Sequence, residues 1–227
     1  LTASIGTALA GGQFARVPVI NGITHDEELL FVAGLGITVS QGTNIPLAGD
    51  PTDPANYQAN IAQALGVTGA RAAAIAGEYP LSAYPSPVAA FSLLVSDASF
   101  ACPALQVDRQ LAARGVPAYA YQFNDDNAPV NLVGASLGLA THGTELPYLF
   151  DQPNAPHPAM LNADQQALAA SMRTAWASFA ASGNPSTRAL SWPLADNGTK
   201  VLSFVPLQSK VTTDFAAAHH CSFWAAG

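Results

Sequence analysis

Apolar and polar positions along the chain predict strands that alternate with helices. Residues 17–24 are rich in Val and Ile and alternate weakly, and residues 116–123 alternate small and aromatic side chains, so both segments predict buried strands. The longest helical pattern covers residues 162–182, and two short β candidates follow it at 200–204 and 210–213. Strands that alternate with helices favour an α/β architecture.

The stretch between the first two predicted strands is mostly helical. Residues 34–54 are rich in Gly, Pro, Thr and Asn, which is typical of a loop. Residues 53–78 then predict two short helices, and residues 87–95 and 99–114 predict two more. This stretch is too long for a minimal crossover between parallel strands, so we predict that residues 35–114 form a largely helical insertion that caps the sheet.

Capping residues support several helix boundaries. Asp53-Pro54 is a good N-cap with Pro at the first helical position. Asn162 or Asp164 can begin the long helix, and Gly183-Asn-Pro185 ends it. Residues 215–224 form a final helical candidate.

Composition places the chain among globular proteins and excludes several kinds of partner. Hydrophobic residues make up 49% of the 227 residues and charged residues only 10%, so the chain can bury a large core and is too apolar to be disordered. The 15 acidic residues outnumber the 8 Lys and Arg residues, and the formal charge is -7. We therefore expect neither nucleic acid nor an anionic membrane surface as a partner.

Targeting and membrane segments are also absent from the pattern. No uninterrupted apolar run approaches the roughly 20 residues of a membrane-spanning helix, so we expect no membrane span. The first residues lack a basic segment followed by a hydrophobic one, so no signal peptide is visible. This does not make the protein cytosolic, because an upstream segment can be missing from the chain.

An acidic cluster and a histidine lie downstream of the first two predicted strands. Asp26, Glu27 and Glu28 would lie in the first turn of a short helix predicted for residues 26–33, and His142 lies in a loop downstream of the second strand. Each has an ordinary interpretation, since an acid there complements the helix dipole in solvent and a loop histidine is usually a surface residue. Yet ligands and reacting groups collect at the carboxyl ends of strands in α/β sheets. An acid that precedes a histidine also fits the order of one class of hydrolytic relay.

The chain has two cysteines, Cys102 and Cys221. By count alone they are either two unrelated buried thiols or a bonded pair, and the residues do not decide between these alternatives.

Five motifs, in order along the chain, match one protein family. The two that carry chemistry are Val17-Pro-Val-Ile-Asn-Gly-Ile-Thr-His-Asp-Glu27 followed by Phe31, and Ala140-Thr-His-Gly-Thr-Glu145 followed by Tyr148-Leu-Phe150. The other three are Ser96-Asp97 to Cys102-Pro103, then Trp176-Ala-Ser-Phe179 with Gly183-Asn-Pro185 and Trp192-Pro193, and finally Cys221-Ser-Phe-Trp224. Together they resemble the acid strand, the histidine motif, the mid-region motif and the C-terminal helix, loop and end of the type-B carboxylesterase and cholinesterase family.

The resemblance implies a fold and a place within it. It covers nearly all 227 residues but only the C-terminal part of the family's length. It therefore implies that residues 1–227 are the C-terminal portion of one α/β-hydrolase catalytic domain, with residues 35–114 as its helical insertion. Position by position, it makes Glu27 the acid of a catalytic triad and His142 the general base. Glu27 would accept a hydrogen bond from the imidazole, which holds the proton-accepting tautomer and stabilises the imidazolium.

The resemblance also pairs the cysteines and shows one departure from the family. Cys102 and Cys221 fall where the family places a disulfide, which would stabilise the fold by about 4–5 kcal/mol in the chain-entropy model and implies an oxidising compartment. The family usually has Gly directly after the acid, and this chain has Glu28. Asn197-Gly-Thr199 is a glycosylation sequon, but such three-residue matches are common by chance.

No convincing nucleophile accompanies the acid and the base. The family's G-x-S-x-G elbow and its Gly-rich oxyanion loop lie upstream of the matching region. The resemblance thus implies that an N-terminal segment of the same protein, nicked or treated as a separate chain, carries the nucleophilic serine. Gly134-Ala-Ser136-Leu-Gly138 does match G-x-S-x-G, but an elbow needs a strand before it and a helix after it. Here turn-rich residues 125–129 precede it and His142 follows within six residues, so Ser136 is the weaker candidate.

The remaining histidines are weak candidates for chemistry. His25 is expected to point to solvent, because neighbours on a strand face opposite sides. His157 lies between prolines in a loop. His219 and His220 adjoin Cys221, but the spacing is poor for metal ligands, so we predict no metal and no cofactor.

The preferred hypothesis is a serine carboxylester hydrolase that acts on a small-molecule ester through an acyl-enzyme. This chain would supply its acid and base, and the protein would be secreted or otherwise extracytoplasmic. One alternative is a non-catalytic, cholinesterase-like adhesion or binding module, which has no reason to keep both Glu27 and His142. Another is a small self-contained hydrolase that uses Ser136.

Overall fold

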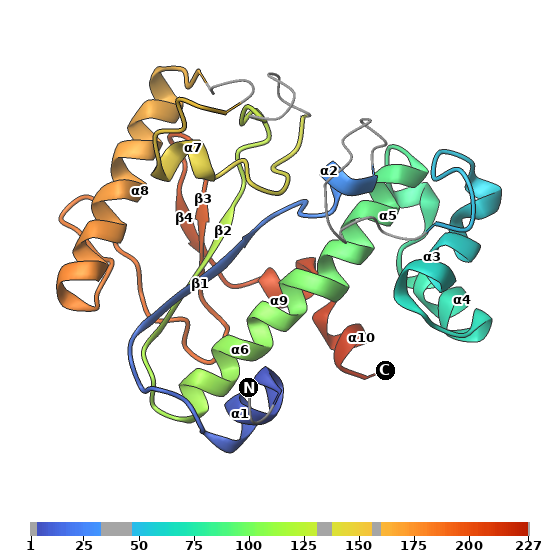
Figure 1. Cartoon of the computed structure of the whole chain (residues 1–227), viewed down its shortest axis with the longest axis horizontal. Helices are drawn as coiled ribbons and strands as arrows, with labels where there is room; N and C mark the ends of the chain where they lie inside the picture. The colour runs from blue at the N-terminus through green and yellow to red at the C-terminus, as the bar shows by residue number, and fades with distance from the viewer. Residues whose placement is uncertain (1–3, 33–46, 131–137, 156–159, 227) are drawn as a thin grey trace.

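The structure is a computed structural model that describes residues 4–32, 47–130, 138–155 and 160–226. Its sheet contains β1 (Val19–Thr24), β2 (Ala118–Phe123), β3 (Val201–Phe204) and β4 (Lys210–Thr212) in that spatial order. The first three strands are parallel and β4 is antiparallel to β3 (Figure 1). Thr24 pairs with Phe123, so β1 and β2 end side by side. The predicted α/β architecture is confirmed, and its aligned strand ends bring the following loops together.

Strand β2 explains how helices cover both faces of the sheet. Successive side chains of a strand face opposite sides. Tyr119 and Phe123 face a core cluster shared with α8 (Ala163–Ser182), whereas Ala118 and Ala120 face a cluster shared with α6 (Cys102–Ala113). The large side chains thus fill the α8 side, and the small ones let α6 approach closely.

Helix α8 has the ends that its sequence predicts. The Asn162 side chain accepts from the backbone N–H of Gln165, and the Gln165 side chain accepts from the N–H of Asn162, which completes a capping box. Gly183 ends the helix in the left-handed conformation, with φ 75°.

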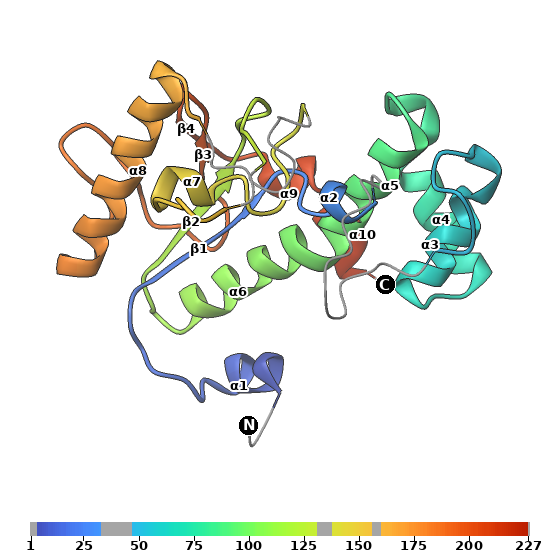
Figure 2. The same cartoon turned by 45° about the horizontal axis from the view of Figure 1, so that its top comes forward.

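The region between β1 and β2 is mostly helical in its described part. Figures 1 and 2 show α3 (Tyr57–Leu65) and α4 (Gly69–Glu78) in a lobe beside the sheet, while α6 runs along one face of it. Asp53 caps the short helix η1 (Pro54–Asn56) with its side chain, as predicted, and Pro54 is at its first position. In order, the elements are α2 (Leu29–Val32), η1 (Pro54–Asn56), α3 (Tyr57–Leu65), α4 (Gly69–Glu78), η2 (Leu81–Ala83), α5 (Pro87–Ser96), η3 (Asp97–Ala101) and α6.

Elements α5, η3 and α6 form one continuous helical run, Pro87–Ala113, where the sequence predicted two separate helices. The π-helical turn η3 joins them at Asp97, a buried residue whose partners come from distant parts of the chain. By length and composition alone the run is apolar enough to cross a membrane, but half of its most apolar window is buried inside the protein. Phe91 and Leu94, for example, pack into a core cluster with Ile75 of α4.

The remaining helices are short. The predicted helix at residues 215–224 is split into α9 (Phe215–Ala218) and α10 (Cys221–Ala225), because His220 adopts a left-handed conformation with φ 50°. The first helix, α1 (Ile5–Gly11), precedes β1, and α7 (Leu146–Leu149) follows the loop that carries His142.

Candidate active site

The acidic cluster, Asp26, Glu27 and Glu28, lies in a tight turn after β1, here called the acid turn. The backbone N–H of Asp26 donates to the carbonyl of Ala140 at 2.8 Å, in an isolated parallel bridge between Asp26 and Thr141. This contact keeps the chain extended through Asp26, so α2 begins only at Leu29. The prediction that the acids lie in the first helical turn is therefore wrong. The helix-dipole interpretation of Glu27 does not apply.

Both carboxylate oxygens of Glu27 accept hydrogen bonds. Its side chain turns back over the end of β1, where Oε1 accepts from the backbone N–H of Thr24 at 2.8 Å. Oε2 lies 2.6 Å from Nδ1 of His142, and Glu27 is only 6% exposed. The structure thus brings together the two residues that the sequence singled out, from positions 115 residues apart.

This geometry assigns different tasks to the two nitrogens of the imidazole. Because the carboxylate accepts, Nδ1–H of His142 donates, and Nε2 is then the basic nitrogen. The hydrogen bond to Glu27 raises the pKa of His142 above its usual 6.5. Burial opposes this rise, while the charges of Glu27, Glu145 and Glu28 add to it. The imidazole is half-exposed, so it can be reached from outside.

A structured loop carries His142. The carbonyl of Thr141 accepts from both the backbone N–H and the hydroxyl of Thr144, at 3.0 and 2.6 Å. Gly143 has φ 81°, a conformation that a residue with a side chain adopts only under strain, and it turns the chain toward α7. His142 therefore projects from a loop that is fixed on both sides.

Two aromatic side chains border the imidazole. The ring centroid of Phe31, on α2, lies 5.3 Å from that of His142, and the centroid of Phe100, on η3, lies at 6.1 Å. Phe31 belongs to a motif quoted from the sequence, whereas sequence reasoning missed Phe100, because only the tertiary fold brings η3 to this site. A reacting group beside His142 would thus lie near apolar walls.

Two further carboxyl groups lie close to the pair. Burial raises the pKa of both Glu28 and Glu145 above the usual range of a glutamate. Glu28 donates its backbone N–H to Ser96 Oγ at 3.0 Å. Glu28 replaces the usual Gly, and Glu27 nonetheless reaches His142.

The sequence also singled out a serine and two further histidines as weaker candidates. Ser136 and His157 lie outside the described residues. His25 was expected to point to solvent, and its side chain is 39% exposed. Its Nδ1 also lies 2.8 Å from Asp26, and its ring packs 5.5 Å from the ring of His219. Burial lowers the pKa of His25, but the hydrogen bond to Asp26 and the surrounding carboxylate charges together raise it.

The C-terminal cysteine and histidines are engaged within the protein. Cys102 and Cys221 form a disulfide with an S–S distance of 2.00 Å, so Cys221 has no free thiolate. His219 donates from Nδ1 to Asp97, and His220 contacts Glu78 at 2.6 Å. In the part of the chain that the structure describes, no group of three or more His, Cys, Asp or Glu side chains is arranged to hold a metal ion.

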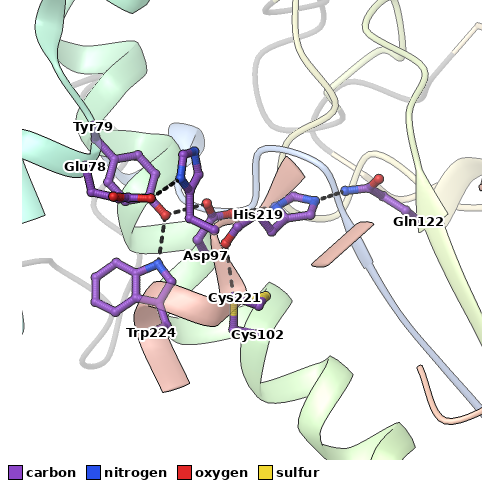
Figure 3. Close-up of a disulfide and its surroundings, with 9 residues drawn as sticks. Glu78, Tyr79, Asp97, Cys102, Gln122, His219, Cys221 and Trp224 are labelled. Atoms are coloured by element: carbon purple, nitrogen blue, oxygen red, sulfur yellow. Dashed lines mark hydrogen bonds and ion pairs between the residues drawn. A yellow bond between two sulfur atoms is a disulfide. The ribbon is translucent and has the colours of Figure 1, made fainter. Parts of the chain in front are cut away.

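Figure 3 shows these contacts as one assembly, here called the C-terminal anchor: Asp97, Gln122, His219 and the Cys102–Cys221 disulfide. The ring of His219 lies between the other two polar side chains. Gln122, on β2, donates its amide N–H to Nε2 of His219 at 2.6 Å, and Asp97 also accepts from the Tyr79 hydroxyl at 2.7 Å. The anchor thus joins the sheet, the helical insertion and the C-terminal helices α9 and α10.

Sequence comparisons show which known proteins this chain is similar to. The sequence pattern of the Carboxylesterase family matches residues 6–224. The chain is 31% identical to cocaine esterase from Homo sapiens over 137 residues, which cover 60% of this chain and 24% of that protein. It is 32% identical to carboxylesterase 4A from Bos taurus over 110 residues (48% of this chain, 20% of that protein). It is also 26% identical to the crystal protein of Dictyostelium discoideum over 184 residues (79% and 30%).

The chain therefore spans between a fifth and a third of the length of these curated relatives. Within that span the family pattern covers almost every residue, including β1, the acid turn, the His142 loop and the C-terminal anchor. This protein belongs to the carboxylesterase family, and its mixed sheet flanked by helices is part of that family's α/β-hydrolase fold.

Proposed function

We propose that this chain supplies the acid and the base of a serine carboxylesterase. The observation that carries the proposal is the 2.6 Å contact between Glu27 Oε2 and His142 Nδ1. Membership of the carboxylesterase family and the esterase names of several relatives support the reaction class.

The geometry supports one sequence of proton transfers. A serine hydroxyl attacks the ester carbonyl while Nε2 of His142 accepts the hydroxyl proton. Glu27 holds Nδ1–H and stabilises the imidazolium that forms. Nε2–H then passes the proton to the leaving alcohol, which leaves an acyl-enzyme. A water molecule hydrolyses the acyl-enzyme by the same transfers in reverse order.

The serine is proposed to come from an N-terminal segment of the same protein. Among the strands that the structure describes, β1 is at the edge of the sheet and pairs only with β2. Its first four residues are only partly buried. An open edge of this kind is a template for further strands, and the family carries its nucleophile elbow upstream. The N-terminal segment would complete the sheet and bring the serine to Nε2 of His142.

The surroundings of His142 favour a small-molecule ester with an apolar group. Phe31 and Phe100 supply apolar walls. Glu28 and Glu145 place negative charge nearby, which disfavours anionic esters. The disulfide suits an oxidising compartment, so we propose a secreted or otherwise extracytoplasmic protein. A non-catalytic adhesion module would require neither Glu27 nor His142 to be held in this way.

The test uses the complete protein, a nitrophenyl ester and a fluorophosphonate label. We expect hydrolysis, with the label on a serine of the N-terminal segment. The variant His142→Gln should lose at least about 10³-fold in kcat. The matched control His220→Asn changes a histidine that pairs with Glu78 away from the site, and it should keep wild-type kcat. Label on Ser136, or full activity in His142→Gln, would overturn the proposal.

A further inference from the structure

The segment Ala140–Thr141 holds the acid turn on both sides of Glu27. On one side, the backbone N–H of Asp26 donates to the carbonyl of Ala140 at 2.8 Å. On the other, the backbone N–H of Leu30 donates to the hydroxyl oxygen of Thr141 at 2.9 Å. The residue next to His142 therefore contacts the turn that carries its carboxylate partner.

The Thr141 hydroxyl satisfies a group that its helix leaves unpaired. The N–H groups of Leu29, Phe31 and Val32 donate to the carbonyls of Asp26 or Glu28 within the turn. Leu30 donates instead to Thr141, across 111 residues of sequence. Leu30 is 4% exposed and Thr141 is fully buried, so water does not replace this bond without a change in the packing.

The two contacts differ in what a substitution can remove. The bond from Asp26 to Ala140 joins backbone groups and survives any change of side chain. The backbone of Thr141 is held separately, because its carbonyl accepts two bonds from Thr144. Removing the Thr141 hydroxyl alone thus releases the acid turn at Leu30 and leaves the His142 loop in place.

We propose that Thr141 is a positioning residue for ester hydrolysis, whose hydroxyl sets the position of Glu27 against His142 by holding the Leu30 N–H. This proposal rests on the proposed catalytic roles of Glu27 and His142. A displacement of about 1 Å between reacting or relay groups is enough to cost about 100-fold in rate. Thr141 acts through the backbone and does not itself touch substrate.

The test compares three variants of the complete protein. Thr141→Val keeps the shape of the side chain and removes its hydroxyl, and Thr141→Ser keeps the hydroxyl. Thr174→Val is the matched control, because Thr174 is exposed on α8 and its hydroxyl donates within that helix, to the carbonyl of Ala170 at 2.7 Å. We expect Thr141→Val to lower kcat about 10- to 100-fold with little change in KM. Thr141→Ser should regain most of this loss, and Thr174→Val should match the wild type.

A second measurement reports the contact between Glu27 and His142 independently of catalysis. The pKa of His142 is followed by NMR on histidine-labelled protein, and in Thr141→Val it should fall toward 6.5, because the hydrogen bond to Glu27 weakens. Wild-type kcat and an unchanged His142 pKa in Thr141→Val would overturn the positioning role, as would equal losses in Thr141→Val and Thr174→Val. An inactive wild type with a lowered His142 pKa in Thr141→Val would instead contradict the esterase proposal and support the structural contact.

Discussion

His219 Nδ1 lies 2.5 Å from Oδ1 of Asp97, and neither side chain is more than 1% exposed. This pair and the pair of His142 and Glu27 have similar geometry but very different surroundings. His142 is half-exposed and pairs with Glu27, whereas His219 is enclosed and its second nitrogen is occupied by Gln122. Of these two histidines, His142 is the one whose ring can be reached from outside, as the proposed reaction requires. The pair of His219 and Asp97 joins elements that are 122 residues apart in the sequence.

Removing His219 is expected to destabilise the protein. The variant His219→Ala leaves the Asp97 carboxylate buried with the Tyr79 hydroxyl as its remaining partner, so the free energy of unfolding should fall by about 3 kcal/mol. His220→Asn is the comparison, because the pair of His220 and Glu78 is partly exposed and its loss should cost less than about 1 kcal/mol. Urea denaturation curves measure both. Equal losses of unfolding free energy in the two variants would show that the buried pair stabilises the protein no more than the partly exposed one.

The pH dependence of the proposed reaction follows from His142. As a base it must be neutral, so kcat/KM falls on the acid side with the pKa of His142 in the free enzyme. The hydrogen bond to Glu27 raises that pKa, so the acid limb of the wild type should lie above pH 6.5. Glu27→Gln removes the charge, moves the limb to lower pH and lowers kcat by about 10³- to 10⁴-fold.

Glu28→Gln is the matched control for this experiment. Glu28 is the neighbour of Glu27 in the same turn, and its charge makes the smallest of the named contributions to the raised pKa of His142. The acid limb should move in the same direction by less, with kcat close to wild type. A larger effect from Glu28→Gln than from Glu27→Gln would show that the roles of the two acids are reversed.

The disulfide is expected to contribute strongly to stability. It closes a segment of 119 residues, for which the chain-entropy model gives about 4–5 kcal/mol. The double variant Cys102→Ala/Cys221→Ala should therefore unfold at a clearly lower temperature than the wild type. Reductant should lower the melting temperature of the wild type by a similar amount. If the double variant melts with the wild type, the C-terminal anchor depends on its hydrogen bonds rather than on the covalent link.

Periodicity and capping were enough to predict much of the fold. Strands β1 and β2 have alternating or β-branched segments, and α8 has an Asn cap and a terminal Gly, all of which are local signals. The continuous helix through Asp97 was not predicted, because the partners of Asp97 are the distant His219 and Tyr79. Likewise, α2 begins later than predicted because Asp26 bonds to the distant Ala140.

The candidate site was predictable only in part for the same physical reason. Position at strand ends selected Glu27 and His142, and the resemblance to a family assigned them to one site. Phe100 and Thr141 lie within motifs quoted from the sequence, but nothing in the local sequence shows that Phe100 borders His142 or that Thr141 holds Leu30. Non-local contacts of this kind require coordinates.

Gly22 provides a test of how tightly the sheet is packed beside the site. A Cβ atom on Gly22 would lie 2.2 Å from the ring of Tyr121 on the neighbouring strand β2. That ring cannot move away easily, because it packs against Trp176, Trp192 and Phe204. Gly22→Ala should therefore lower the free energy of unfolding by about 1–3 kcal/mol, the usual cost of overpacking.

The control for Gly22 is another glycine in open surroundings. Gly77 lies within α4, and nothing stands within 4 Å of the position that its Cβ would occupy. Gly77→Ala should stabilise the protein by about 0.5–1 kcal/mol, because alanine favours a helix interior. Denaturation curves of both variants give the comparison. If Gly22→Ala is as stable as the wild type, the Tyr121 ring does not lie against Gly22 as described, and the close contact between β1 and β2 at this position is contradicted.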